Sequence, residues 1–117
     1  MITTTFAIIS ALIHILFFTL ESVLFTKKLG RTIFRMTDEQ AQANRLFAFN
    51  QGFYNLFLAF GIFISLALEK ESLLVFCLSS MFLAGIVLVF SSKDLWRGTL
   101  IQSVPPLIAL LSLIFKF

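Results

Sequence analysis

Charged residues are scarce in this sequence. Asp, Glu, Lys and Arg together make up only 13% of its 117 residues, whereas a typical soluble domain has about 25%. Hydrophobic residues make up 59%, and they are arranged in long blocks, as the hydrocarbon core of a membrane requires. The composition therefore argues against a soluble globular domain and predicts an integral membrane protein.

Cysteine and histidine occur once each. Because Cys77 is the only cysteine, no internal disulfide can form, and its place inside an apolar run is typical of a buried, inert thiol. Cys77 and His14 lie in different blocks and fall short of the three or four ligands that a zinc site needs, so no metal site is predicted. The sequence also contains no phosphate-binding glycine loop and no nucleophile elbow, and no cofactor is predicted.

Four apolar blocks predict the fold. Each is long enough for one membrane-spanning helix of about 20 residues, and they lie at about 3–25, 46–68, 72–90 and 99–115. We expect an all-α protein, a four-helix transmembrane bundle that forms a single integral membrane domain over residues 1–117. The first block lacks the basic start and the cleavage pattern of a signal peptide, so we interpret it as a retained helix.

Basic residues are concentrated in the connection 26–45. This connection holds Lys27, Lys28, Arg31, Arg35 and Arg45; the third holds Lys93 and Arg97, the second only Lys70, and the C-terminus only Lys116. The positive-inside rule then predicts that the first and third connections are cytoplasmic and that both termini lie on the other side of the plasma (inner) membrane. The net charge of +3 is explained by this topology and by anionic lipid headgroups, so the expected partner is membrane lipid and not nucleic acid.

A capping box marks the start of the second helix. Thr37 is followed three positions later by Gln40, a pattern in which each side chain bonds the backbone N–H of the other residue. We therefore expect this helix to begin near Thr37, outside the hydrocarbon. The preceding segment 31–36 mixes basic and apolar residues, which is typical of a segment at the membrane interface.

Two ionisable residues lie inside the first block, where a charged group costs about 2.5–3.5 kcal/mol on insertion scales. His14 and Glu21 are seven positions apart, so they share one face of a helix. The opposite face carries apolar residues suited to lipid: Ile9, Ile13, Leu16 and Leu20. The pattern predicts that His14 and Glu21 point into the bundle.

The second and fourth blocks contain further polar side chains. On one broad face of the second helix we expect Asn50, Gln51, Tyr54 and Asn55. Gly52 lies away from that face, where it permits a close helix contact. Gln102 lies just inside the fourth block, before Pro105 and Pro106. With 1.5 Å of rise per residue, the polar residues of all three helices fall in the cytoplasmic half, so we expect them to converge on one pocket.

Three functions are compatible with this pocket. In the first, it binds a small lipophilic molecule, and whether it also converts that molecule is left open. Glu21 and His14 are then the expected acid/base pair. The expected ligand-binding residues are Asn50, Gln51, Tyr54, Asn55 and Gln102. In the second, the polar groups only fix helix register in a structural or partner-binding protein. In the third, the protein is a proton-linked transporter, for which a homo-oligomer would have to supply a continuous path because the outer half is mostly apolar.

The polar motifs resemble those of a known family. His14-x6-Glu21, Asn50-Gln51-Gly52-x-Tyr54-Asn55 and Gln102-x2-Pro105 are similar to motifs of the uncharacterised bacterial membrane family called domain of unknown function 1304. The resemblance covers essentially the whole chain and implies a small four-span inner-membrane protein without an assigned activity. The alanine that usually follows the proline at Pro105 is Pro106 here.

A weaker resemblance is to the membrane-associated enzymes of eicosanoid and glutathione metabolism. Those enzymes also have four spans, a basic loop after the first helix and polar residues at the start of the second. Glu21, Arg45 and Asn50 are similar to residues of that family. Where that family carries a glutamate after the asparagine, this sequence has Gln51, so the resemblance serves as an analogy only.

Overall fold

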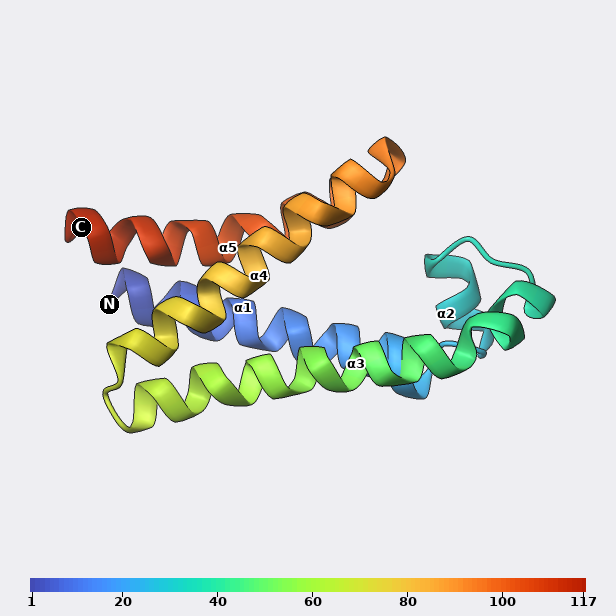
Figure 1. The fold of residues 1–117 in the computed structure, drawn as a ribbon, viewed down its shortest axis with the longest axis horizontal. Coiled ribbons are helices and arrows are strands. Elements are labelled where there is room, and N and C mark those ends of the chain that lie inside the picture. Colours follow the sequence, from blue (N-terminus) through green and yellow to red (C-terminus); the bar gives the residue numbers. More distant parts are fainter. The chain divides into compact units, whose positions relative to one another are not determined.

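The computed structural model describes all 117 residues, and helices are its only regular secondary structure (Figure 1). Its elements are α1 (Ile2–Phe18), the π-helical turn η1 (Thr19–Val23), α2 (Lys28–Ile33), α3 (Asp38–Ala67), α4 (Glu71–Ser91), the short 3-10 turn η2 (Lys93–Leu95) and α5 (Trp96–Phe115). There is no strand. The predicted all-α fold class is therefore confirmed.

Four helical segments are long and apolar enough to cross a membrane. They are Ile2–Val23, Asp38–Ala67, Glu71–Ser91 and Lys93–Phe115. Each contains an 18-residue apolar window with no more than two charged residues, and a helix of 20 residues spans about 30 Å of hydrocarbon. By length and composition, the chain is a multi-pass membrane protein.

The chain divides into two compact units. One comprises Met1–Ile13 together with Leu58–Phe117 and is called the terminal unit here; the other comprises His14–Phe57 and is called the central unit. The terminal unit holds α4, η2, α5, the start of α1 and the end of α3. The central unit holds the end of α1, η1, α2 and the start of α3.

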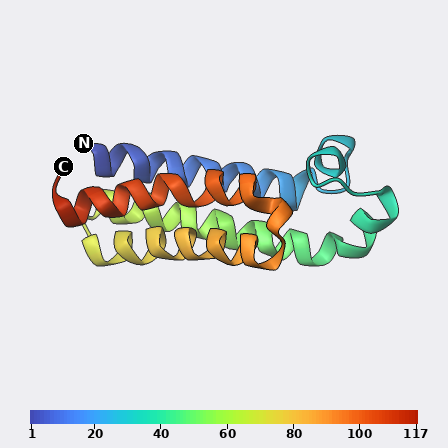
Figure 2. The same cartoon turned by 90° about the horizontal axis from the view of Figure 1, so that it is seen from above.

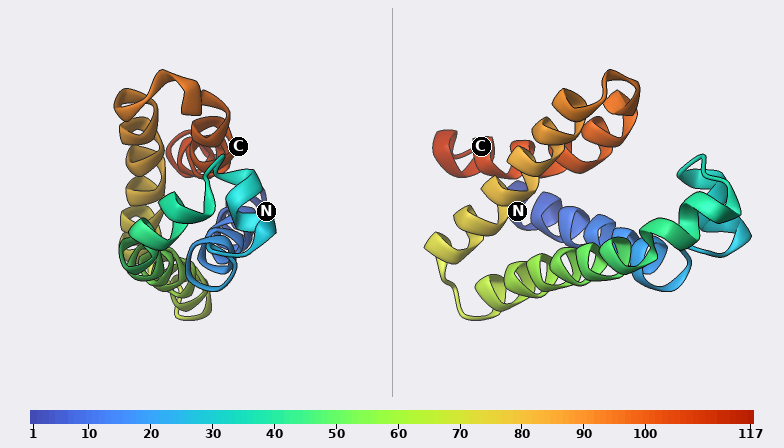
Figure 3. Two further views of the ribbon diagram at one scale, coloured as in Figure 1. Left: turned by 90° about the vertical axis from the view of Figure 1, so that its right-hand side faces the viewer. Right: turned by 45° about the vertical axis from the view of Figure 1, so that its right-hand side comes forward.

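In the terminal unit, α4 and α5 form an antiparallel pair. Figures 1 and 3 show the two helices closest near the η2 connection. There the hydroxyl of Thr99 donates to the carbonyl of Gly85 at 2.8 Å, and that of Ser103 donates to the carbonyl of Phe82 at 2.9 Å. A Cβ added to Gly85 would collide with the Ser103 hydroxyl, so the absent side chain is what allows this close approach.

The two ends of the chain lie at the same end of the terminal unit (Figure 2). The hydroxyls of Thr3 and Ser112 share a hydrogen bond there, which joins the first turn of α1 to the last turns of α5. The end of α3 packs against α4, where a Cβ on Gly61 would meet the Cys77 sulfur at 2.6 Å. Small residues therefore set the helix spacing in this unit.

In the central unit, η1 packs closely against α3. The Ser22 hydroxyl donates to the Phe49 carbonyl at 2.7 Å, and a Cβ on Gly52 would collide with Ser22. The rings of Phe18 and Phe53 meet edge to face with their centroids 5.1 Å apart, an arrangement that aromatic quadrupoles favour. The predicted role of Gly52 in a close helix contact is confirmed, but its predicted place away from the face of Asn55 is wrong, because both residues lie on the buried stripe that faces η1.

The connection between η1 and α3 is folded around a small apolar cluster. Phe25, Ala41 and Ala48 are buried in it, and Met36 packs against them. The predicted capping box is confirmed: the Gln40 N–H donates to the Thr37 hydroxyl at 3.1 Å, and the Gln40 side-chain oxygen accepts from the Thr37 N–H at 3.0 Å. α3 therefore begins at the predicted position, and Figures 1 and 2 show its first turns at the same end of the unit as α2.

One orientation predicted for the first helix is wrong. Ile9 and Leu16 are exposed, as expected for residues facing lipid, but Leu20 is buried. Leu20 lies in η1, where the Leu24 N–H bonds to the Thr19 carbonyl five positions back at 2.9 Å. This wider turn changes the register of the helix, so position 20 no longer continues the stripe of Ile9 and Leu16.

Candidate functional site

Glu21 is held in the π-helical turn that ends the first membrane-spanning segment. The turn is stabilised at its start by the Thr19 hydroxyl, which donates to the Ile15 carbonyl at 3.0 Å. Turns of this kind inside α-helices occur frequently at functional sites because they move one side chain out of the regular helical register. In this chain the wide turn contains the only glutamate of its segment.

Asn55 positions the carboxylate of Glu21. Its side-chain amide donates a hydrogen bond to Oε1 of Glu21 at 2.6 Å. Asn55 is only 7% exposed and follows Ala48 and Gly52 along the buried stripe of α3. The donor is neutral, so it orients the carboxylate without neutralising it.

Two hollows in the central unit share Glu21. One, of about 620 Å³, is lined by Glu21, Phe47, Ala48, Asn50, Gln51 and Tyr54. The other, of about 430 Å³, is lined by Glu21, Ser22, Val23, Phe25, Thr26, Arg45, Leu46 and Phe49. Both volumes suit a small molecule, and Glu21 supplies the carboxylate of each.

The four polar residues predicted on α3 thus adjoin Glu21, though with different burial. Asn55 is buried and bonded to the carboxylate, whereas Asn50, Gln51 and Tyr54 are exposed and line the larger hollow. Tyr54 is 65% exposed. These three side chains are therefore accessible to a molecule in the hollow and do not form part of a packed core.

His14 and Gln102 have other surroundings. His14 is fully buried, and its ring meets that of Phe17 edge to face at 5.3 Å; it lines neither of the hollows that contain Glu21. Gln102 belongs to the terminal unit, where its amide makes a long contact of 3.4 Å to the Met81 carbonyl. The pairing of His14 with Glu21 and the convergence of Gln102 on the same pocket stay predictions.

Several residues that line the hollows were not predicted from the sequence as ligand contacts. Phe47 and Ala48 line the larger hollow, and Ser22, Leu46 and Phe49 line the smaller one. Most are apolar, and in an apolar block such residues give no signal that separates the wall of a hollow from a lipid-facing surface. Arg45 also lines the smaller hollow; its charge at the edge of a membrane-spanning segment and its part in the weaker resemblance were the two signals that pointed to it.

The comparisons with known proteins give one match. A family model described as "Protein of unknown function (DUF1304)" matches residues 8–114. Neither the search of curated proteins nor that of solved structures found a match. The matched range includes Glu21, Asn55 and every residue that lines the two hollows.

Proposed function

The chain belongs to the DUF1304 family of proteins of unknown function, and from this starting point we propose that it binds a small lipophilic molecule with a polar end at Glu21. The observation that carries the proposal is the position of one carboxylate, which is held by Asn55 and lines two hollows. An ionisable residue within a membrane-spanning segment is costly, and such residues usually mark functional sites.

The bond to Asn55 occupies one oxygen of the carboxylate. A carboxylate accepts through two oxygens, so Glu21 can also accept a hydrogen bond from a hydroxyl or an amine of a ligand. In the larger hollow Asn50, Gln51 and Tyr54 add neutral donors and acceptors. Such a set orients a polar end, while Phe47 offers apolar contact to the rest of the molecule.

A catalytic form of the proposal uses the same carboxylate. Glu21 takes a proton from one position of the bound molecule and returns it at another, which is an isomerisation with no net loss of atoms. His14 is the second ionisable group of this segment, but it lines neither hollow, so Glu21 carries both proton transfers in this form. Binding does not depend on this extension.

The proposal includes a membrane orientation. The connection 26–45 carries five of the nine Lys and Arg residues, which favours the cytoplasmic side of the plasma (inner) membrane and puts both termini on the opposite side. The Glu21 site then lies in the cytoplasmic half of the membrane, because Glu21 precedes this connection by only five residues.

A structural function is the second candidate, and specific contacts favour it. Within the central unit, Ser22 bonds to Phe49 and abuts Gly52, while Glu21 bonds to Asn55. These contacts follow one another along α3 at intervals of three residues and hold η1 against it. In this reading, Glu21 fixes helix register and binds no ligand.

Native mass spectrometry of the gently purified protein, followed by extraction of small molecules, distinguishes the two functions. We expect a defined mass that accompanies the wild type and is lost in Glu21→Gln. Glu71→Gln is the matched control, because it makes the same change on an exposed residue in the first turn of α4. Retention of the mass by Glu21→Gln would overturn the proposed role of this carboxylate.

Tyr54→Phe separates ligand binding from stability. Tyr54 is mostly exposed and lines the larger hollow, so removal of its hydroxyl should leave the thermal unfolding temperature unchanged and weaken retention of the ligand. If no sample carries a ligand and Glu21→Gln only unfolds at a lower temperature, the structural function is the correct one.

A further inference from the structure

The short helix α2 is amphipathic although it belongs to no membrane-spanning segment. Leu29 and Ile33 are 55% and 49% exposed, and their spacing of four residues puts them on one stripe of the helix. Lys28 and Arg31 are the basic residues of the same helix. Helices with exposed apolar residues and a basic face lie in the plane of the membrane interface.

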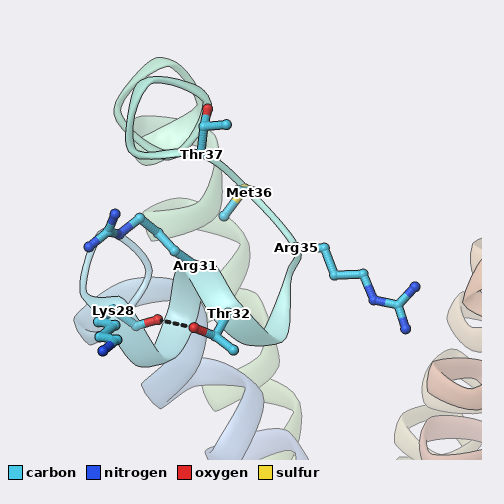
Figure 4. Close-up of a pocket in the computed structure, with 6 residues that line it drawn as sticks. All are labelled: Lys28, Arg31, Thr32, Arg35, Met36 and Thr37. Carbon is cyan, nitrogen blue, oxygen red and sulfur yellow. Dashed lines mark hydrogen bonds between the residues drawn. The ribbon is translucent and has the colours of Figure 1, made fainter.

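Next to this helix is a hollow that is basic and contains no acidic residue. Its volume is about 580 Å³, and it is lined by Lys28, Arg31, Thr32, Arg35, Met36 and Thr37 (Figure 4). In that view the side chains of Lys28 and Arg31 extend to one side, and that of Arg35 extends to the other. The Thr32 hydroxyl donates to the Lys28 carbonyl at 2.8 Å, which fixes this wall of the hollow.

Arg31 carries a further sign of a binding role, and Arg35 lies in the turn that ends the helix. The Nε of Arg31 is buried without a hydrogen-bond partner, a costly arrangement that an acceptor nearby would relieve. Arg35 has a φ of 55° in the turn that ends α2, where the Met36 N–H bonds back to the Arg31 carbonyl at 2.9 Å. Glycine is the usual residue at this place in such a turn, but Glu69 and Lys116 adopt the same left-handed conformation after α3 and α5, so this backbone conformation is a feature of helix ends in this chain.

We propose that this hollow binds the phosphate of an anionic phospholipid headgroup, with Leu29 and Ile33 inserted among the neighbouring acyl chains. Arginine and lysine are the residues that recognise phosphate, by forked hydrogen bonds and by charge respectively. The exposed apolar stripe indicates a lipid as the source of the phosphate, because a soluble phosphate would make no use of it. The inference is independent of the Glu21 site.

Binding of defined lipids to the full-length protein in detergent tests the proposal by native mass spectrometry. The lipids are a phosphatidylglycerol and a phosphatidylcholine with the same acyl chains. The test variant is Lys28→Gln with Arg31→Gln, and the matched control is Lys93→Gln with Arg97→Gln, which removes the same charge from another connection. We expect the test variant to bind phosphatidylglycerol about 30-fold more weakly, from the loss of two basic groups near a headgroup, and the control to bind as the wild type does.

Two further measurements distinguish a lipid phosphate from a soluble phosphate. Leu29→Ser with Ile33→Ser should weaken phosphatidylglycerol binding, and inorganic phosphate at equal concentration should not displace the lipid from the wild type. If inorganic phosphate binds as tightly as the lipid, the hollow is a site for soluble phosphate and the proposal is wrong. It is also wrong if the test variant and the control weaken binding equally, since the effect is then one of net charge.

The variant Arg35→Gly tests the site without the risk of misfolding. Glycine relieves the strain of the left-handed backbone at this position, so the variant should unfold at or above the wild-type temperature. We expect it to bind phosphatidylglycerol several-fold more weakly, from the loss of one basic group. Unchanged lipid binding in this variant would remove Arg35 from the site and contradict the proposal.

Discussion

The two units use their polar side chains differently. In the terminal unit, Thr99 and Ser103 donate to backbone carbonyls of α4, and these bonds hold two helices together. In the central unit, Glu21 receives its bond from the side chain of Asn55, and the residues around it line open hollows. The first arrangement closes a helix interface, whereas the second leaves polar groups accessible.

The difference shows why a count of polar residues does not identify a site in a membrane protein. Hydroxyl and amide groups in both units satisfy the need of buried polar groups for partners. The central unit differs because its ionisable group, Glu21, lines a hollow. The exposed side chains of Asn50, Gln51 and Tyr54 line the same hollow. Accessibility, and not polarity alone, makes this region the candidate site.

The largest expected effect breaks both units at their close contacts. Gly52→Leu and Gly85→Leu each force a side chain into space occupied by Ser22 or Ser103, so each should lower the free energy of unfolding by about 3 kcal/mol. Unfolding by titration with a denaturing detergent, followed by circular dichroism, measures this loss. Retention of the ligand then separates the variants: Gly52→Leu should lose it, because Glu21 and Asn55 move apart, and Gly85→Leu should keep it.

These two variants control each other, since they make the same substitution in different units. A loss of ligand in Gly85→Leu that equals the loss in Gly52→Leu would contradict the assignment of the site to the central unit alone.

An intermediate effect is expected for Asn55→Leu. This substitution keeps the size of the side chain and removes the donor to Glu21, so it should destabilise the protein by about 2 kcal/mol, the cost of leaving a hydrogen-bonding group without its partner. The same detergent titration measures it. Asn44→Leu is the control on the same helix, because Asn44 is exposed and bonds only to the Gln40 carbonyl. Equal losses of stability in the two variants would show that the bond to Glu21 does not contribute more to the free energy of unfolding than a bond on the exposed face.

The smallest loss of stability is expected for Ser103→Ala, in the terminal unit. Ser103→Ala removes one bond between α5 and α4, and we expect a loss of about 0.6 kcal/mol, the average for such contacts in membranes. Ligand retention should be unchanged. If Ser103→Ala releases the ligand, the polar groups of the terminal unit also belong to a binding site and the contrast between the units fails.

Much of the helical architecture could be predicted because it follows from local patterns. The apolar blocks predicted all four membrane-spanning segments, and the spacing of Thr37 and Gln40 predicted where α3 begins. Leu20 was placed on the wrong face because the prediction assumed 3.6 residues per turn, whereas η1 is wider. A π-helical turn depends on the packing around it, and no residue pattern in this sequence predicts one.

The candidate site was predictable only in part. Glu21, Asn50, Gln51, Tyr54 and Asn55 were identified as polar residues in apolar surroundings, and the structure brings them to one region of the central unit. Which of them is buried, and which lines a hollow, could not be predicted, because all four residues of α3 lie on one broad face by helical spacing. The apolar residues of the hollows gave no signal at all.

By itself the sequence determined the properties that depend on composition and on residues close in the chain. These are the membrane class, the helical segments and the excess of basic charge before α3, all of which follow from transfer energies and local hydrogen bonding. Only the tertiary structure decided that Asn55 bonds to Glu21 and that Ser22 abuts Gly52. Those contacts join residues about 30 positions apart, and their formation depends on how two helices pack, which no local rule specifies.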